Sequence, residues 1–464
     1  MSHLKRLPVA AFIALGIVGS ALCSAAAQAQ EPAGGQERHV LENGVTVLLR
    51  PVPGLAQVAV ESFYEVGLVH EPAGMPQAAH LLEHLVCMAA TANHEAGESM
   101  QQLATFGLAN AETLPDWTHY DYMAPSERLE EILKIEAERL SSLRIDEAII
   151  RQEGPRCAQE VDFVERSPQA GMGKFAFSAL AQNWRHGRNV AHIREGLDRY
   201  DAGELNVFHV ATYRPENLTL VIVGDFDPAE ALEFARTHVG AVPERDAPTI
   251  DPIDWQKAPK RATVTWDSKV QAVCLAFPPP EDPTERAVLS LVGAMLQQRL
   301  AGDAALRGTV DALYTPNHLW PVGELPFFNY AAATPGADLE QVEALLMERV
   351  RTLVEHGGGI PPATFKALAR QLASSSQALA EARVRQTARI LARDGRTESQ
   401  AIAMVLGQGA INWGVAVRFL GEDPEQVVAD LEALTAERLA EIVRTNLAED
   451  RLIVTRLVPE AAGE

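Results

Sequence analysis

The segment His-Leu-Leu-Glu-His, residues 80–84, places two imidazoles four residues apart with a carboxylate between them. On an α-helix, residues four apart lie on one face, so His80 and His84 can bind one metal ion together. Zinc accepts imidazole nitrogens at about 2.0–2.1 Å. Glu83 would lie beside that face, close enough to act as a general base on a water without taking a ligand position. The spacing therefore predicts a zinc site with a general base alongside it.

An ordinary helix with surface histidines is the alternative interpretation of this segment. The neighbouring residues argue against it, because unpaired polar groups on a buried helix would be costly. These neighbours are apolar, namely Ala78, Ala79, Leu81, Leu82, Leu85 and Val86. The context favours a metal site.

A catalytic zinc needs a third protein ligand and an open position. The segment 147–164 contains Glu153 and Glu160, which are two helical turns apart and would face one way on a continuous helix. Glu160 would then bind the metal while Glu153 orients or shields the site. Gly154-Pro155 predicts a kink or a helix start between them, because proline removes a helical N–H and disfavours helix at the preceding residue. By spacing alone, the two glutamates are equally consistent with surface residues.

The elements that must position these residues alternate between strand-like and helix-like patterns. In the first half, strands are expected at 44–50, 58–66 and 218–226, and helices at 76–91 (with Pro76 in the first turn), at 127–143 and from 227–228 onward. A proline-rich segment at 240–262 reads as a linker. After it, strands are expected at 262–266, 270–278, 311–320, 327–334 and 452–458, with helices between them.

This repeated order predicts a duplicated α+β (α/β) unit, with two homologous halves that each contain a mixed sheet flanked by helices. The expected domains are a signal peptide at 1–29, a zinc-binding half at 30–245 and a metal-free half at 246–464. A length of 464 residues, with 47% hydrophobic and 22% charged residues, fits more than one globular domain. The second half contains no further H-x-x-E-H.

The net charge of the chain limits its possible partners. The formal net charge is −22, without a Lys/Arg block, which argues against nucleic acid and anionic membrane surfaces as partners.

Lys5 and Arg6 precede an apolar run at 9–22, and Ala27-Gln28-Ala29 follows, as in a cleaved secretory signal. The run is short for a membrane anchor, and the residues before Cys23 fit a lipoprotein site poorly. No other transmembrane stretch is expected, so the protein is predicted to be periplasmic or secreted.

The chain resembles the pitrilysin/insulinase metallopeptidases, the inverzincins, along nearly its whole mature length. The resemblance rests on H-x-x-E-H, on Glu160 about seventy-six residues past His84 and on Glu153 seven before Glu160. Two further signatures support it: the segment Asn110-Ala111-Glu112-Thr113-Leu114-Pro115-Asp116-Trp117-Thr118-His119-Tyr120, and the set Tyr213, Pro215, Asn217, Leu220, Gly224 and Asp225.

The resemblance implies one Zn²⁺ per chain, held by His80, His84 and Glu160, with Glu83 as the general base. It implies two halves that close like a clamshell over a chamber for short or unfolded peptides. Arg307 and Tyr314 match a pair from the silent half that holds the substrate or its oxyanion. Edge-strand pairing near Asn110 and Ala111 would bind an extended peptide backbone.

Two cysteines flank the expected site. Cys87 follows His84 by one turn, at a position where the family usually has an aromatic residue, and Cys157 precedes Glu160 by one turn. Plain packing, a disulfide between them, and Cys87 as an accessory ligand are three open interpretations. The chain has too few cysteines for a fold that is held together by a set of disulfide bonds.

The sequence therefore predicts a zinc metalloendopeptidase. The alternatives are a catalytically silent partner subunit of a two-chain peptidase and a metal-dependent hydrolase that acts on something other than peptides. The expected partners are a peptide or unfolded protein substrate and a second copy or a related chain in a homodimer or heterodimer. Nucleic acid is not expected as a partner, nor is a membrane after signal cleavage.

Overall fold

The structure is a computed structural model that describes residues 35–166, 171–245, 250–315, 327–359, 361–367, 381–392, 396–420 and 424–460. The predicted signal peptide at 1–29 lies outside the described residues.

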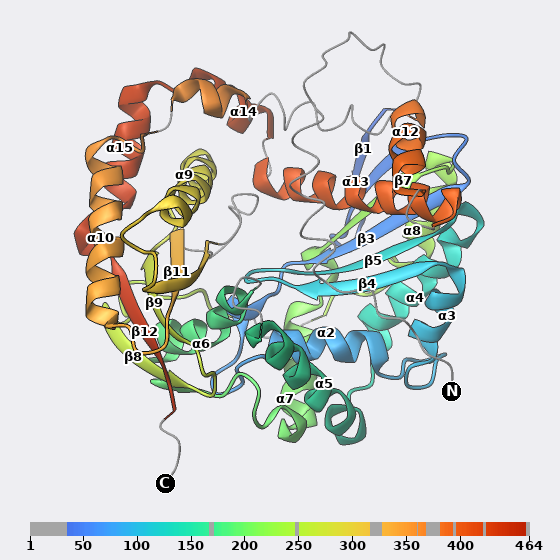
Figure 1. The fold of residues 1–464 in the computed structure, drawn as a ribbon. Helices are drawn as coiled ribbons and strands as arrows, with labels where there is room; N and C mark the ends of the chain where they lie inside the picture. The colour runs from blue at the N-terminus through green and yellow to red at the C-terminus, as the bar shows by residue number, and fades with distance from the viewer. Residues whose placement is uncertain are drawn as a thin grey trace. The chain divides into compact units, whose positions relative to one another are not determined.

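The first mixed sheet has six strands in the order β1-β2-β7-β3-β5-β4 (Figure 1). β2 runs parallel to β7 and the other neighbours are antiparallel, which leaves β4 at an edge. The strands are β1 (Glu37–Val40), β2 (Thr46–Pro51), β3 (Gln57–Tyr64), β4 (Leu108–Thr113), β5 (Thr118–Pro125) and β7 (Leu218–Gly224).

The helices of the first half are α2 (Ala78–Met88), α3 (Glu98–Phe106), α4 (Leu129–Ser142), α5 (Glu147–Glu165), α6 (Met172–His186), α7 (Ala202–Thr212) and α8 (Pro228–His238). Side chains alternate across a strand, so the two faces of β3 have different neighbours. Val58 and Val60 share a buried cluster with α2, whereas Ala59 and Phe63 share another with a helix from the end of the chain.

The second mixed sheet has the order β10-β11-β9-β12-β8-β6, in which β12 and β6 run parallel to β8. Its strands are β6 (Val190–Ala191), β8 (Arg261–Trp266), β9 (Gln271–Phe277), β10 (Val310–Tyr314), β11 (Phe327–Ala333) and β12 (Ile453–Pro459). The helices are α9 (Pro283–Gly302), α10 (Leu339–Glu355), α12 (Glu381–Leu391), α13 (Glu398–Leu420), α14 (Pro424–Ala433) and α15 (Ala436–Asn446). The predicted pair of mixed sheets flanked by helices is confirmed.

Each sheet also receives a helix from the other part of the chain. α13 packs across β3, β5 and β7 of the first sheet (Figure 1), and α6 packs on β8, β10 and β11 of the second. Within the described residues, α13 is the one helix long and apolar enough to cross a membrane, contrary to the expectation of no such stretch. Its buried Leu406 and Ala410 instead share a core with Phe63 and Met123, as in a core helix.

Two local predictions around the histidines were wrong. α2 begins at Ala78, after Pro76, because Gln77 adopts a left-handed conformation with φ 65° and ψ 12°. α5 runs without interruption from Glu147 to Glu165 with Pro155 inside it. The lost N–H costs about 3 kcal/mol in a helix interior, so the packing of buried side chains such as Ile150 and Val161 must outweigh it.

Candidate metal centre

The two histidines of α2 face the carboxylates of α5. His80 Nε2 lies 3.5 Å from Glu160 Oε2, and His84 Nε2 lies 3.6 Å from the same oxygen. The two imidazole rings are perpendicular, with centroids 5.1 Å apart. Three donor atoms from two helices therefore converge on one point.

These separations fit a tetrahedral zinc ion. Ligand atoms about 2.0–2.1 Å from a tetrahedral centre lie roughly 3.3 Å from each other. The distances from Glu160 Oε2 to the two ring nitrogens are 3.5 and 3.6 Å. The side chain of Glu160 is 55% exposed, so a fourth position can be reached from solvent.

His80 is oriented by a residue that the sequence analysis missed. Its Nδ1 lies 2.9 Å from Oε1 of Gln77, and both residues are buried. An amide oxygen only accepts hydrogen bonds, so Nδ1 donates and Nε2 keeps its lone pair for a metal. Burial lowers the pKa of His80, and the Glu160 contact opposes only part of that change. A neutral imidazole is the form that binds metal. Gln77 is marked out by its positive φ, and a backbone angle cannot be read from the sequence. No sequence signal could therefore have identified this residue.

His84 is oriented by Glu153. His84 Nδ1 lies 3.5 Å from Glu153 Oε2, and Glu153 is 1% exposed. Glu153 Oε1 accepts from Arg156 at 2.6 Å and from Gln152 at 2.8 Å. Burial alone would lower the pKa of His84, but Glu153 and Glu160 raise it to about 10. A bound metal would replace that proton.

The two histidines also affect the pKa of Glu160. Burial would raise its pKa, but His80 and His84 outweigh burial and hold the pKa well below its usual range. Glu160 is therefore ionised, as a carboxylate ligand must be.

Glu83 lies next to this point and is half-buried. Thr113 Oγ1, at the end of β4, donates to Glu83 Oε2 at 2.8 Å. One carboxylate oxygen is thus fixed while the other is left for a proton, as a general base requires. Thr113 lies inside the segment that carried the family resemblance, but its role was not predicted.

The two cysteines differ in position. Cys87 and Cys157 are both buried free thiols. Cys157 Sγ, and not Cys87, lies beside the histidines, 3.0 Å from His80 Nδ1. That nitrogen is on the ring edge away from Glu160, and burial followed by nearby carboxylates raises the pKa of Cys157 well above its usual value. Glu160 Oε2 lies beside Nε2 of both histidines, so Glu160 is the better third donor.

The residues predicted to contact the substrate lie on different elements of the structure. Asn110 and Ala111 lie on β4, the edge strand of the first sheet, and Asn110 is exposed. Tyr314, at the end of β10, packs against Gly173 and Phe177 of α6, and burial followed by the charges of Glu112 and Asp116 raises its pKa. Arg307 is exposed in the turn before β10. In the described parts of the chain, no hydrogen bond or ion pair joins Arg307 or Tyr314 to the metal centre.

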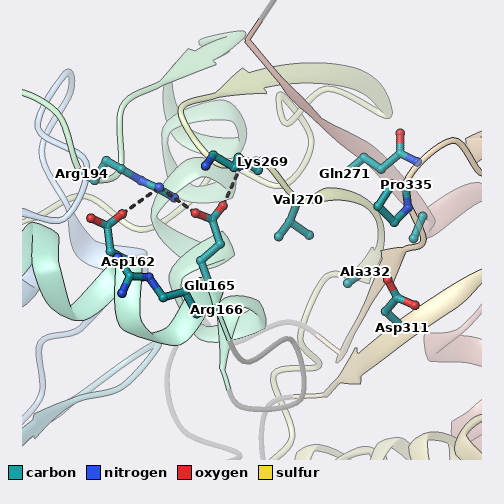
Figure 2. Close-up of a pocket in the computed structure, with 11 residues that line it drawn as sticks. Asp162, Glu165, Arg166, Arg194, Lys269, Val270, Gln271, Asp311, Ala332 and Pro335 are labelled. Atoms are coloured by element: carbon teal, nitrogen blue, oxygen red, sulfur yellow. Dashed lines mark hydrogen bonds and ion pairs between the residues drawn. The ribbon is translucent and has the colours of Figure 1, made fainter. Parts of the chain in front are cut away.

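A pocket lies further along α5, beside the second sheet (Figure 2). Arg194 binds Asp162 at 2.9 Å and Glu165 at 2.7 Å. Glu165 also accepts from the backbone N–H of Lys269 at 2.6 Å. These paired charges tie α5 to the loop between β8 and β9, so they serve the fold that holds Glu160 in place.

Comparison with known proteins identifies the family of the chain. Residues 46–192 match the insulinase family (peptidase family M16), and residues 199–372 match the peptidase M16 inactive domain. The zinc protease PqqE of Helicobacter pylori is 27% identical over 262 residues, which span 56% of this chain and 58% of that protein. The match thus covers less than two thirds of that relative.

Solved structures share the fold. A protease from Helicobacter pylori superposes with a TM-score of 0.61 at 19% identity, covering 92% of this chain and all of that one. The periplasmic protease PqqL from Escherichia coli gives 0.53 at 17% identity, over 93% of this chain and 48% of that one. With both halves matched and the fold shared, the chain belongs to the insulinase (M16) family of zinc proteases.

Proposed function

We propose that this protein is a zinc-dependent metalloendopeptidase that cleaves short or unfolded peptides. The observation that carries the proposal is the convergence of His80 Nε2, His84 Nε2 and Glu160 Oε2 at separations suited to one zinc ion. A degenerate subunit would have no reason to keep Glu83, both histidines and both orienting partners in register.

The chemistry follows from the residues around that point. A zinc ion held there would polarise the scissile carbonyl and lower the pKa of a water. Glu83 would accept the proton of the attacking water on its free oxygen and later deliver it to the leaving amine. The hydroxyl of Thr113 keeps the Glu83 carboxylate in position between these two transfers.

Substrate binding is proposed at β4. Among the described strands, none pairs with its outer edge, and Thr113 on the same strand touches Glu83. An extended peptide added to this edge would be held by main-chain hydrogen bonds near Asn110 and Ala111 and would pass the metal centre. Such binding gives low sequence specificity, which suits unfolded substrates.

We place this activity in the periplasm or outside the cell. The support is the signal-like N-terminal sequence, together with the periplasmic location stated for the E. coli neighbour. The same proposal includes one zinc per chain at this centre and pairing with a second copy or a related chain. It also includes the oxyanion role of Arg307 and Tyr314.

The alternative is a catalytically silent partner subunit. The observation that favours it is that Arg307 is exposed and that no hydrogen bond or ion pair among the described residues joins it to the metal centre. A silent subunit would bind peptide or a partner chain without hydrolysing it.

The deciding experiment is hydrolysis of a quenched fluorescent peptide by the purified mature chain. We expect cleavage that stops on chelation and returns with Zn²⁺. Glu83→Gln should lower the rate by about 10²–10⁴-fold without loss of zinc, since it removes general-base catalysis but no ligand. Glu355→Gln, an exposed position at the end of α10, is the matched control and should retain full activity. Equal rates in Glu83→Gln and the parent would refute the assignment of Glu83 as general base.

A further inference from the structure

A second group of ionisable side chains lies on the opposite face of the first sheet from α2. It consists of Glu61 on β3 and His119 and Asp121 on β5. Their neighbours on the same face, such as Phe63 and Met123, pack against α13. A ligand-type atom from each of the three residues lies within 4.8 Å of the others. The cluster is separate from the metal centre, because the sheet lies between them.

All three side chains are more than nine-tenths buried, with exposures of 0% for Glu61, 5% for His119 and 3% for Asp121. Glu61 and Asp121 are directly opposite each other in the β3–β5 register. Like charges at such positions repel across about 5 Å. Two buried carboxylates on neighbouring strands therefore require a positive partner.

The protein itself satisfies this requirement poorly. Within the part of the chain that the structure describes, four atoms have no hydrogen-bond partner: both oxygens of Glu61, Oδ1 of Asp121 and Nδ1 of His119. His119 Nδ1 lies 2.5 Å from Asp121 Oδ1 and 3.7 Å from Glu61 Oε2, but neither contact is aligned as a hydrogen bond. Among the described residues, no lysine or arginine pairs with Glu61 or Asp121. His119 and Asp121 thus form one close ion pair, whereas both buried oxygens of Glu61 have no hydrogen bond to any described residue.

We propose that Glu61, His119 and Asp121 form a second metal site, which binds a divalent transition-metal ion such as Zn²⁺ or Mn²⁺. A neutral imidazole and two carboxylates carry two negative charges, which one divalent ion neutralises. The mixed nitrogen and oxygen set suits these ions better than Ca²⁺, which takes six to eight oxygen ligands.

A proton is the competing occupant. Burial, followed by the charge of Asp121, raises the pKa of Glu61 well above its usual value, and His119 opposes this. Burial would lower the pKa of His119, but Asp121, Glu112 and Glu61 raise it well above its usual value. A protonated His119 or a protonated Glu61 would reduce the repulsion without any metal. A metal-bound cluster and a protonated cluster differ in the number of metal ions per chain, so a metal count distinguishes them.

The site would brace the strand that we propose binds peptide. Asn110 of β4 donates to Asp121 Oδ2 at 3.3 Å, and Glu112 of β4 lies 3.9 Å from His119 Nε2. Glu112 is itself held by Lys174 at 3.1 Å. An ion between β3 and β5 would thereby fix the side chains against which the edge strand rests.

The test is a zinc count on the purified mature chain, equilibrated with Zn²⁺ and freed of excess by gel filtration. We expect two equivalents in the parent, one in His80→Ala/His84→Ala and one in Glu61→Gln/Asp121→Asn. Glu83→Gln should keep two, so loss of catalysis and loss of this site are distinguishable. One equivalent in the parent and none in His80→Ala/His84→Ala, with the same counts after equilibration with Mn²⁺ instead of Zn²⁺, would overturn the proposal.

Anomalous diffraction at the zinc edge from crystals of the parent decides the matter even if the Glu61→Gln/Asp121→Asn variant does not fold. A peak bounded by Glu61, His119 and Asp121 is expected. The same crystals soaked with Mn²⁺ and measured at the manganese edge are expected to show a peak at this place too. Peaks at the His80 site or on the surface, with none between these three residues at either edge, would contradict the proposal.

Discussion

The two halves use the same strand–helix–strand connection in different ways. In the first half α2 and then α3 lie between β3 and β4, and in the second α9 lies between β9 and β10. Along α9, the buried positions four apart are all aliphatic: Val288, Val292, Leu296 and Leu300. Along α2, the corresponding spacing carries His80 and His84. The same helix spacing thus carries aliphatic core residues in one half and the residues of the proposed metal site in the other.

The difference lies in what each helix meets. α2 packs on α5, whose Glu153 and Glu160 face the histidines. α9 packs on β10, β11, α14 and α15, and contributes aliphatic residues to a core there. A buried imidazole is stabilised only where a partner reaches it. The two halves therefore differ in the elements that pack against α2 and α9 as much as in α2 and α9 themselves.

The largest effect should come from removing a ligand. His84→Ala is expected to abolish peptide hydrolysis and zinc binding at the centre between α2 and α5, because two remaining donors cannot complete that site, and to leave only the equivalent at Glu61, His119 and Asp121. His356→Ala, at the exposed end of α10 in the second half, is the matched control and should change neither. Metal analysis and the fluorescent peptide assay measure both. Zinc retained at the parent's stoichiometry and affinity by His84→Ala would break the comparison between the halves.

A smaller effect is expected at the partner of His84. Glu153→Gln should weaken zinc affinity by about 10–100-fold, since it removes the charge that orients the ring. Glu147→Gln, at the exposed start of the same helix, should leave affinity unchanged. Competition with a chromogenic chelator gives the values. Equal affinities would mean that Glu153 only packs.

Two glycines sharpen the comparison on stability. A Cβ on Gly154 would lie 2.5 Å from the backbone nitrogen of Asp198, whereas a Cβ on Gly302 of α9 would meet nothing within 4 Å. Gly154→Ala should therefore destabilise by about 1–3 kcal/mol, and Gly302→Ala should stabilise by up to about 1 kcal/mol. Denaturant unfolding monitored by circular dichroism measures both. A stable Gly154→Ala would show that the contact beside α5 can relax.

The smallest effect is expected at Gln77. Gln77→Gly relieves a left-handed backbone that costs a side chain about 1–2 kcal/mol, but it deletes the hydrogen bond to His80. Zinc affinity should fall by about 10-fold while stability holds or rises. Chelator competition and unfolding curves separate the two effects. If affinity does not change, the amide does not orient His80.

Much of the fold was predictable because its signals are local. Alternation identified β2, β3, β8 and β9, and the Asp227-Pro228 pair marked the start of α8. The start of α2 and the continuity of α5 were mispredicted, since the backbone conformation of Gln77 and the packing around Gly154 are set by distant residues.

The linear order of residues determined which side chains are able to share a metal, because His80, Glu83 and His84 stand on neighbouring turns of one helix whatever surrounds it. Only the tertiary structure decided that Glu160 reaches them, that Gln77 and Glu153 orient them and that Cys157 rather than Cys87 lies alongside. It also decided that Glu61 and Asp121, sixty residues apart, share one buried space. Spacing within a helix follows from its fixed rise and turn, whereas contacts between elements depend on how the whole chain packs.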